Sequence, residues 1–211
     1  MRNYLKFALY LFLVLGISSA FAGAYENYFR AIDVDNASDV RALLERGFDP
    51  NTPDQSGQVG LYLALRAGSL SVAEALITSG DLKVDATNRH GETAVMMAAL
   101  RGLPDWVARL LDRGAALNRE GWSPLHYAAS GPSPQAVRLL LDRGARIDAP
   151  SPLGGTPLMM AAQYGSEDTV SLLLARGADP RLRDGRGLGA GDYARRGGRE
   201  NLARRLDAAA R

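Results

Sequence analysis

A helix-ending phrase recurs along the chain at a nearly constant spacing, and this periodicity limits the possible folds more than any other feature. It occurs as LLERG, LITSG, LLDRG, LLDRG and LLARG, with glycines at positions 47, 80, 114, 144 and 177. These glycines are 33, 34, 30 and 33 residues apart. Each fits the end of a helix, where the chain needs a left-handed residue that glycine adopts at low cost. A fixed period of roughly 20–50 residues indicates small units that bury their apolar faces only against one another.

A second marker keeps the same period. The phrases VGLYLAL, TAVMMAA, SPLHYAA and TPLMMAA recur in step with the glycines. Their alanines in register are Ala31, Ala64, Ala98, Ala128, Ala161 and Ala194. Ser or Thr before Pro is typical of a helix start, and the Asp-, Asn-, Gly- and Pro-rich stretches between phrases are typical of turns. Six helix-turn-helix units are therefore predicted.

These phrases resemble the ankyrin repeat, whose TPLHxA signature is matched best by SPLHYA at 123–128 and TPLMMA at 156–161. The resemblance covers about residues 26–210. It implies an all-α ankyrin-repeat solenoid of about six helix-turn-helix units joined by β-turn fingers. The units are expected at about 26–52, 53–86, 87–117, 118–149, 150–182 and 183–211. The link from Gly114 to Ser123 is three residues shorter than the link from Gly144 to Thr156, so a short finger is expected in the fourth unit.

The amino terminus has the three-part plan of a signal peptide. Arg2 and Lys6 precede an apolar run over residues 7–17, and small residues end at Ala22. Residues 1–22 are predicted to be a cleaved signal peptide, with 23–211 as the ankyrin-repeat domain in the periplasm or outside the cell. An uncleaved leader would instead make the protein a membrane-tethered adaptor. The apolar run is shorter than the roughly 20 residues that span a bilayer as a helix, so stable membrane insertion is not expected.

The composition argues against several classes of function. The chain has no cysteine and two histidines, which disfavours a metal site, and no cofactor is expected. Removing the leader lowers Lys+Arg from 25 to 23 and leaves Asp+Glu at 23, so the mature chain is formally neutral. Nucleic-acid binding needs a basic surface, so nucleic acid is not an expected partner.

His126 is the side chain that most resembles a catalytic group. The equivalent residues in other repeats are Tyr62, Met96, Met159 and Asp192. The family resemblance implies a structural role, in which His126 ties its own helix start, through Ser123, to the turn backbone of the next unit. No catalytic residue is therefore predicted, and a hydrolase using His126 with a nearby carboxylate is the alternative.

Three other patterns are interpreted as structure. Asp142 and Arg143, which repeat an earlier Asp-Arg pair, are interpreted as a solvated helix end. The glycines of GRGLGAG at 185–191 lack the strand and lysine of a phosphate loop and are interpreted as a loose terminal finger. The Met96-Met97 and Met159-Met160 pairs are interpreted as core filler rather than a soft metal site.

Binding to another protein is the predicted function, because repeat stacks expose a long surface of finger tips and first helices. The predicted partner-binding residues are Gln58, Arg66, Arg89, His90, Glu92, Leu100, Arg101, Arg119, Glu120, Trp122, Ser130, Leu153, Gln163 and Tyr164. Trp122 is the leading candidate, because exposed aromatics dominate interfaces. Packing over the shortened finger is its structural alternative. The central arginines favour a partner with an acidic patch. The chain is thus expected to be a non-catalytic exported scaffold that inhibits, protects or helps mature a periplasmic enzyme or toxin.

Overall fold

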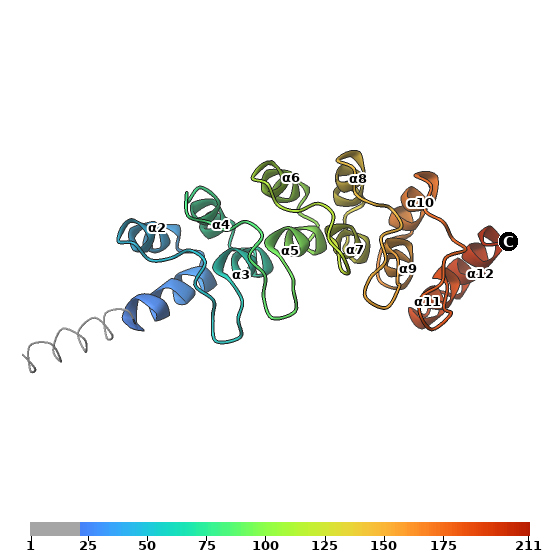
Figure 1. Ribbon diagram of the computed structural model, residues 1–211, viewed down its shortest axis with the longest axis horizontal. Coiled ribbons are helices and arrows are strands. Elements are labelled where there is room, and N and C mark those ends of the chain that lie inside the picture. Colours follow the sequence, from blue (N-terminus) through green and yellow to red (C-terminus); the bar gives the residue numbers. More distant parts are fainter. Residues whose placement is uncertain (1–21) are drawn as a thin grey trace, which may run out of the picture. The chain divides into compact units, whose positions relative to one another are not determined.

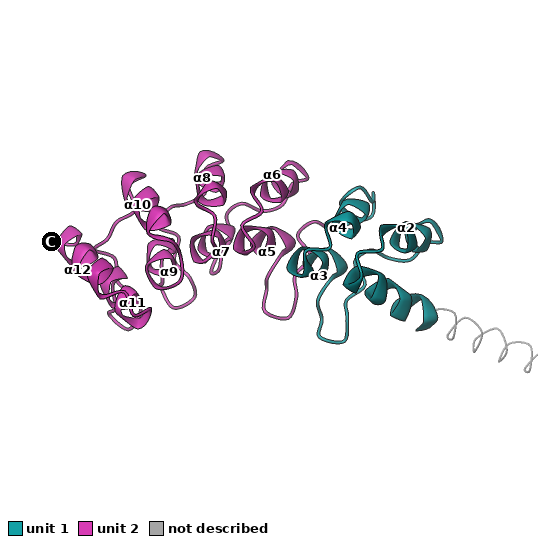
Figure 2. Ribbon diagram, turned by 180° about the vertical axis from the view of Figure 1, so that it is seen from behind, with its two compact units in different colours: residues 1–83 teal, residues 84–211 magenta. Residues whose placement is uncertain are grey.

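The computed structural model describes residues 22–211, so the predicted signal peptide lies outside the described residues except for Ala22. Within that range all regular elements are helices, as the sequence predicts. A single antiparallel bridge between Pro53 and Val59 is the β pairing found among those residues. The helices form two compact units, which divide between Lys83 and Val84 (Figure 2).

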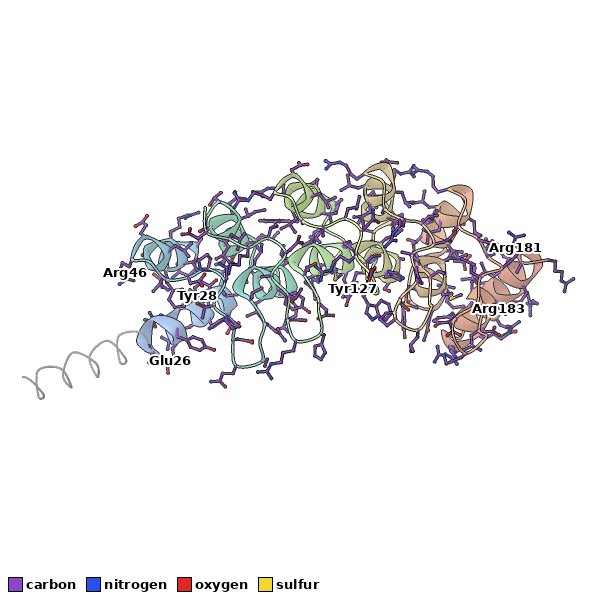
Figure 3. The ribbon with its side chains drawn as sticks, viewed as in Figure 1. Glu26, Tyr28, Arg46, Tyr127, Arg181 and Arg183 are labelled. Carbon is purple, nitrogen blue, oxygen red and sulfur yellow. The ribbon has the colours of Figure 1, made fainter. Side chains whose placement is uncertain are left out.

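The first unit contains a helix over residues 22–33 and three further helices (Figure 1). These are α2 (Ala37–Glu45), α3 (Gly60–Ala67) and α4 (Leu70–Ile77). Tyr28 is fully buried, and its hydroxyl donates to the Pro50 carbonyl at 3.1 Å. Burial raises the pKa of Tyr28 well above its ordinary value, and the charge of Asp49 adds to the effect. Tyr28 therefore acts as a neutral anchor between the amino-terminal helix and the first link (Figure 3).

The second unit contains four helix pairs. They are α5 (Ala94–Leu100) with α6 (Pro104–Asp112), α7 (Pro124–Ser130) with α8 (Pro134–Asp142), α9 (Pro157–Gln163) with α10 (Glu167–Ala175), and α11 (Ala190–Arg196) with α12 (Glu200–Ala209). Each pair packs together, and the first helices also pack in series from α5 through α7 and α9 to α11. Figure 2 shows α5, α7 and α9 in one row and α6, α8 and α10 in another.

The first and second helices of each pair bury different amounts of surface. The first helices have neighbours on several sides, so even consecutive residues such as Met159 and Met160 are buried, at 1% and 6% exposure. The methionine pairs are core residues, as predicted. The second helices bury one stripe at helical spacing, as in α6 with Trp106, Val107 and Leu110. Trp106 is therefore a core residue, with 7% exposure.

Polar side chains join successive repeats through their links. In the second unit, the Asp85 carboxylate accepts the Ala116 N–H at 2.9 Å. The Asp148 carboxylate accepts the Asp179 N–H at 3.1 Å in the same way. In the first unit, the Asn51 amide oxygen accepts the Lys83 N–H at 2.7 Å. The polar links are therefore connectors between repeats as well as turns, which the sequence interpretation missed.

The Asp-Arg pairs at the ends of the second helices also connect repeats. Arg143 forms an ion pair with Asp112, and Arg176 forms one with Asp142, both at 2.8 Å. The helix ends are solvated, as predicted, but their charges pair across the repeat boundary rather than with their sequence neighbours. Exposed pairs of this kind contribute about 0–1 kcal/mol each, so they supply little of the stacking energy.

One expectation about the helix-ending glycines was wrong. Gly47, Gly114, Gly144 and Gly177 have φ between 84° and 92°, but Gly80 is not left-handed. At that helix end the Thr78 hydroxyl donates to the carbonyls of Glu74 and Ala75, both at 3.0 Å, and replaces the glycine cap.

The terminal finger is not loose, because the buried Asp184 organises it. Its carboxylate accepts the Arg186 and Leu188 backbone N–H groups, both at 2.9 Å, and the Tyr193 hydroxyl at 3.0 Å. Burial opposes ionisation of Asp184, but these hydrogen bonds and the Arg186 guanidinium hold its pKa well below the ordinary value.

Candidate functional site

A mostly apolar pocket of about 240 Å³ opens in the second unit, at the point where the finger is short. Side chains from α5, the short finger, α7 and α9 meet there. The lining residues are Leu100, Trp122, His126, Tyr127, Ser130, Met160 and Tyr164. The pocket therefore joins three consecutive helix pairs.

The short finger places Trp122 at the pocket. The chain turns at Gly121, which has a φ of 74°, and α7 begins three residues later, at Pro124. The Trp122 ring lies edge-on to His126 at 5.3 Å and to Tyr127 at 6.3 Å between ring centroids, yet 40% of the residue stays exposed. The ring therefore packs against two side chains of α7 and also lines the pocket, and its binding role stays a prediction.

His126 has the geometry of a structural connector. The Ser123 backbone N–H donates to Nδ1 at 3.2 Å, and the Ser123 Oγ lies 2.9 Å from the same nitrogen. Because Nδ1 accepts, the proton resides on Nε2, which donates to the Gly155 carbonyl at 3.0 Å in the next finger. Burial lowers the pKa of His126, while hydrogen bonding with the Gly155 and Ala149 backbone opposes that shift.

The neutral imidazole therefore ties one helix start to the following repeat, in the geometry that the resemblance implies. Both ring nitrogens are engaged, and neither is held by a carboxylate. A general base needs a nitrogen within reach of substrate, so this arrangement disfavours the hydrolase alternative.

The hydroxyl groups of Tyr127 and Ser130 are also engaged. The Tyr127 hydroxyl donates to Glu92 at 2.8 Å, and the Ser130 hydroxyl donates to the His126 carbonyl at 2.9 Å. Glu92 also accepts from the Asn88 side chain at 2.7 Å. The interior of the pocket therefore presents ring faces, methylene groups and the Met160 thioether.

Four predicted partner-binding residues line this pocket: Leu100, Trp122, Ser130 and Tyr164. The sequence interpretation did not include Tyr127 and Met160, which occupy the same position in successive repeats, or assign His126 to the surface. Arg89, His90, Arg101, Glu120 and Leu153 are exposed outside the pocket lining, and Glu92, Arg119 and Gln163 are half-buried. Gln58 and Arg66 belong to the first unit. The binding role of all these residues remains a prediction.

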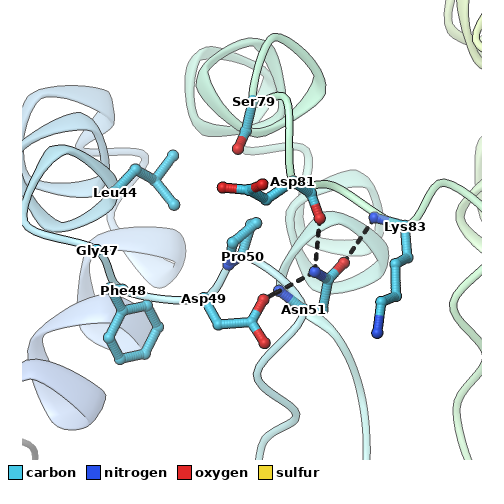
Figure 4. A pocket seen from close by; sticks show the side chains of 9 residues that line it. All are labelled: Leu44, Gly47, Phe48, Asp49, Pro50, Asn51, Ser79, Asp81 and Lys83. Atoms are coloured by element: carbon cyan, nitrogen blue, oxygen red, sulfur yellow. Dashed lines mark hydrogen bonds between the residues drawn. The ribbon is translucent and has the colours of Figure 1, made fainter.

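The first unit has a separate hollow of about 390 Å³ beside its links (Figure 4). The Asn51 side chain crosses it and donates to Asp49 and to the Asp81 carbonyl, both at 2.8 Å. The Asn51 amide oxygen also accepts the Lys83 N–H, so both ends of this amide form hydrogen bonds that help to join the two links. We interpret this hollow as the space left beside a structural connector.

Within residues 22–211, no group of three His, Asp or Glu side chains is placed to hold a metal ion. None of the helices in the same range has the length and apolar character to cross a membrane.

Comparison with known proteins identifies the repeat. A family model described as ankyrin repeats in three copies matches residues 29–120 and 114–184, which is more than half of the chain. The chain belongs to the ankyrin-repeat family. Among residues 22–211, six helix pairs, the fingers between them and the His126 connector are the corresponding features of this ankyrin-repeat protein.

Similar proteins match only in part. The human neurogenic locus notch homolog protein 4 is 38% identical over 34% of this chain and 4% of its own length. The ankyrin repeat domain-containing protein 46 of Rattus norvegicus is 30% identical over 34% of this chain and 44% of its own length. The match therefore spans less than half of either curated relative.

One solved structure resembles nearly the whole fold. It is the Bd0816 predatory endopeptidase of Bdellovibrio bacteriovorus in complex with the immunity protein Bd3460. The likeness has a TM-score of 0.72 and 24% identity, and it covers 86% of this chain and 97% of the matched chain. At that identity the likeness supports the ankyrin fold.

Proposed function

We propose that this ankyrin-repeat protein is a non-catalytic exported scaffold that binds an exported enzyme and inhibits it. The enzyme that we propose is a peptidase. The pocket at the short finger is the observation that carries the binding role. It brings a half-exposed tryptophan and two tyrosines together with a leucine and a methionine, and tryptophan and tyrosine are enriched among the residues that supply most of the binding energy of protein interfaces.

Two further features support the specific version. The similar solved structure is a complex of an endopeptidase with an immunity protein, which suggests the class of partner. The leader sequence suggests the compartment in which the two proteins would meet. An inhibitor of this kind needs a rigid surface rather than a reactive group. The hydrogen bonds of His126 to Ser123 and Gly155 contribute to such rigidity.

The test compares capture by the purified protein with capture by two variants. Tyr164→Ala removes a side chain that is 62% exposed at the pocket, and Leu182→Ala removes one that is 36% exposed elsewhere in the same unit. Each variant is first checked for an unchanged melting temperature. The exported protein fraction of the source cells is then passed over each immobilised protein, and bound proteins are identified by mass spectrometry.

The proposal expects a peptidase that binds the wild type and Leu182→Ala but binds Tyr164→Ala at least about tenfold more weakly, as loss of an interface anchor predicts. Purified wild-type protein should also lower the hydrolysis rate of that peptidase in a saturable way. Capture of a non-enzyme partner, or a peptidase that stays fully active when bound, would refute inhibition. Equal capture by all three proteins would refute the placement of the binding surface.

A further inference from the structure

We propose that the pocket at the short finger receives one apolar side chain from a peptide segment of the partner, and that acidic residues flank that side chain. This inference rests on the proposed binding function and adds the chemistry of the bound segment. It concerns only the second unit, where all the residues of the pocket lie.

The size of the pocket favours a side chain over a free ligand. At about 240 Å³ it is smaller than the roughly 300–1,000 Å³ of typical small-molecule sites. Its interior polar groups on His126, Tyr127 and Ser130 already have protein partners. A small polar ligand would therefore find few groups to orient it, whereas an aliphatic or aromatic side chain needs only the apolar walls.

The rim of the pocket offers hydrogen-bond donors. Trp122 and Tyr164 are 40% and 62% exposed, and they carry an indole N–H and a phenol O–H. Arg101 is exposed and directly follows Leu100, one of the lining residues. Glu120 is the exposed acid of the short finger, and Glu92 is already engaged with Tyr127. The two rim donors, together with the exposed Arg101 next to a lining residue, favour carboxylate and carbonyl oxygens on the bound segment.

The walls are held in place before binding. Glu92 holds the Tyr127 ring, and His126 fixes the start of α7 to the next finger. Gly131 fixes the spacing of α5 and α7, because a Cβ there would lie only 2.7 Å from the Leu100 carbonyl oxygen. A preformed pocket loses little conformational entropy on binding, so even a short peptide should report on it.

The test uses three blocked tripeptides with the sequences Asp-Phe-Asp, Asp-Ala-Asp and Lys-Phe-Lys. The chain has two tryptophans, so the ¹⁵N-labelled protein gives two indole N–H signals in NMR spectra. Trp122 is half-exposed at the pocket, and Trp106 is 7% exposed and serves as an internal control. Substitution Trp106→Phe assigns the two signals. Each peptide is titrated to about 20 mM, a range that reaches millimolar dissociation constants.

Asp-Phe-Asp should shift the Trp122 signal saturably and leave Trp106 unmoved. Asp-Ala-Asp and Lys-Phe-Lys should each bind at least about tenfold more weakly, because burial of the apolar group or the favourable charge is lost. Arg101→Gln should weaken Asp-Phe-Asp binding, while Arg138→Gln, an exposed arginine on α8, should not.

No shift of Trp122 with either phenylalanine peptide would overturn the apolar anchor. Equal or tighter binding of Lys-Phe-Lys would overturn the acidic flanks and indicate a cation-binding aromatic site instead. These results do not depend on capture of a peptidase. Peptide binding without an inhibited enzyme would refute the proposed function alone, and an inhibited enzyme without peptide binding would refute this inference alone.

Discussion

Replacing His126 tests the structural role of the residue that most resembles a catalytic group. His126→Ala removes the acceptor of the Ser123 N–H and the donor to the Gly155 carbonyl. Ser123 is 1% exposed, so its N–H loses its partner away from water, at a cost of about 1–3 kcal/mol. The Gly155 carbonyl retains its hydrogen bond from the Ser151 N–H at 2.8 Å, so losing the His126 donor there costs only about 1 kcal/mol.

The missing ring also leaves a cavity beside Trp122. The total loss in free energy of unfolding for His126→Ala is therefore about 3–5 kcal/mol. His126→Met is the matched variant, because Met159 occupies the same position two helices later and its Sδ accepts the Thr156 N–H at 3.4 Å. Methionine keeps the volume and a weak acceptor, so a loss of about 1–2 kcal/mol is expected.

Urea unfolding at pH 7.5, followed by circular dichroism, measures both values. A loss under about 1 kcal/mol for His126→Ala would refute the connector role. A folded His126→Met that abolished a turnover activity would establish the catalytic alternative.

The pH dependence gives a second view of the same residue. Burial holds the pKa of folded His126 below the value of about 6.5 expected in the unfolded chain. Between these two values the unfolded state binds more protons, so the free energy of unfolding falls as pH drops below about 6.5. His126→Met should lack this part of the slope, and equal slopes for the two proteins would contradict the assignment.

Three further outcomes are expected from urea unfolding. Gly165→Ala should lose about 2–3 kcal/mol, because a Cβ would collide with the Ala129 carbonyl; a loss below about 1 kcal/mol would contradict that packing. Because the pKa of Asp184 is depressed in the folded state, this residue stabilises the fold above the unfolded pKa of about 3.9, and that stability is lost as pH falls. Asp184→Asn should therefore be less stable at pH 7. Its free energy of unfolding should also depend less on pH between about pH 4 and 2. Asp142→Asn, which breaks the exposed pair with Arg176, should change stability by no more than about 1 kcal/mol, and a larger loss would contradict the small contribution expected of an exposed pair.

The sequence predicts the repeat fold well because its markers are local. The helix-ending glycines and the phrases such as SPLHYAA and TPLMMAA each report on a single turn or helix start, and the five glycines and four phrases reinforce one another. The short finger is likewise readable as three missing residues. The failure at Gly80 has a local cause, since the Thr78 hydroxyl caps that helix and removes the need for a left-handed residue.

The candidate site is less predictable, because it depends on contacts between repeats. Tyr127 and Met160 lie at an ordinarily buried repeat position, and only the stacked structure shows that the short finger leaves them beside a pocket. Asp112 pairs with Arg143, and Asp85 accepts the Ala116 N–H. Each contact joins residues about one repeat apart, which no local pattern indicates. The binding residues, the unit boundaries and the exported location remain predictions.

Photo-crosslinking from the pocket tests the central claim most directly. A benzoylphenylalanine residue is placed at position 164 beside the pocket, or at position 138 on α8, and the native cells are irradiated. We predict that position 164 yields one covalent adduct with an exported peptidase, attached to a segment with an apolar residue between acidic ones, and that position 138 yields none. An adduct formed from position 138 and absent from position 164 would contradict the account.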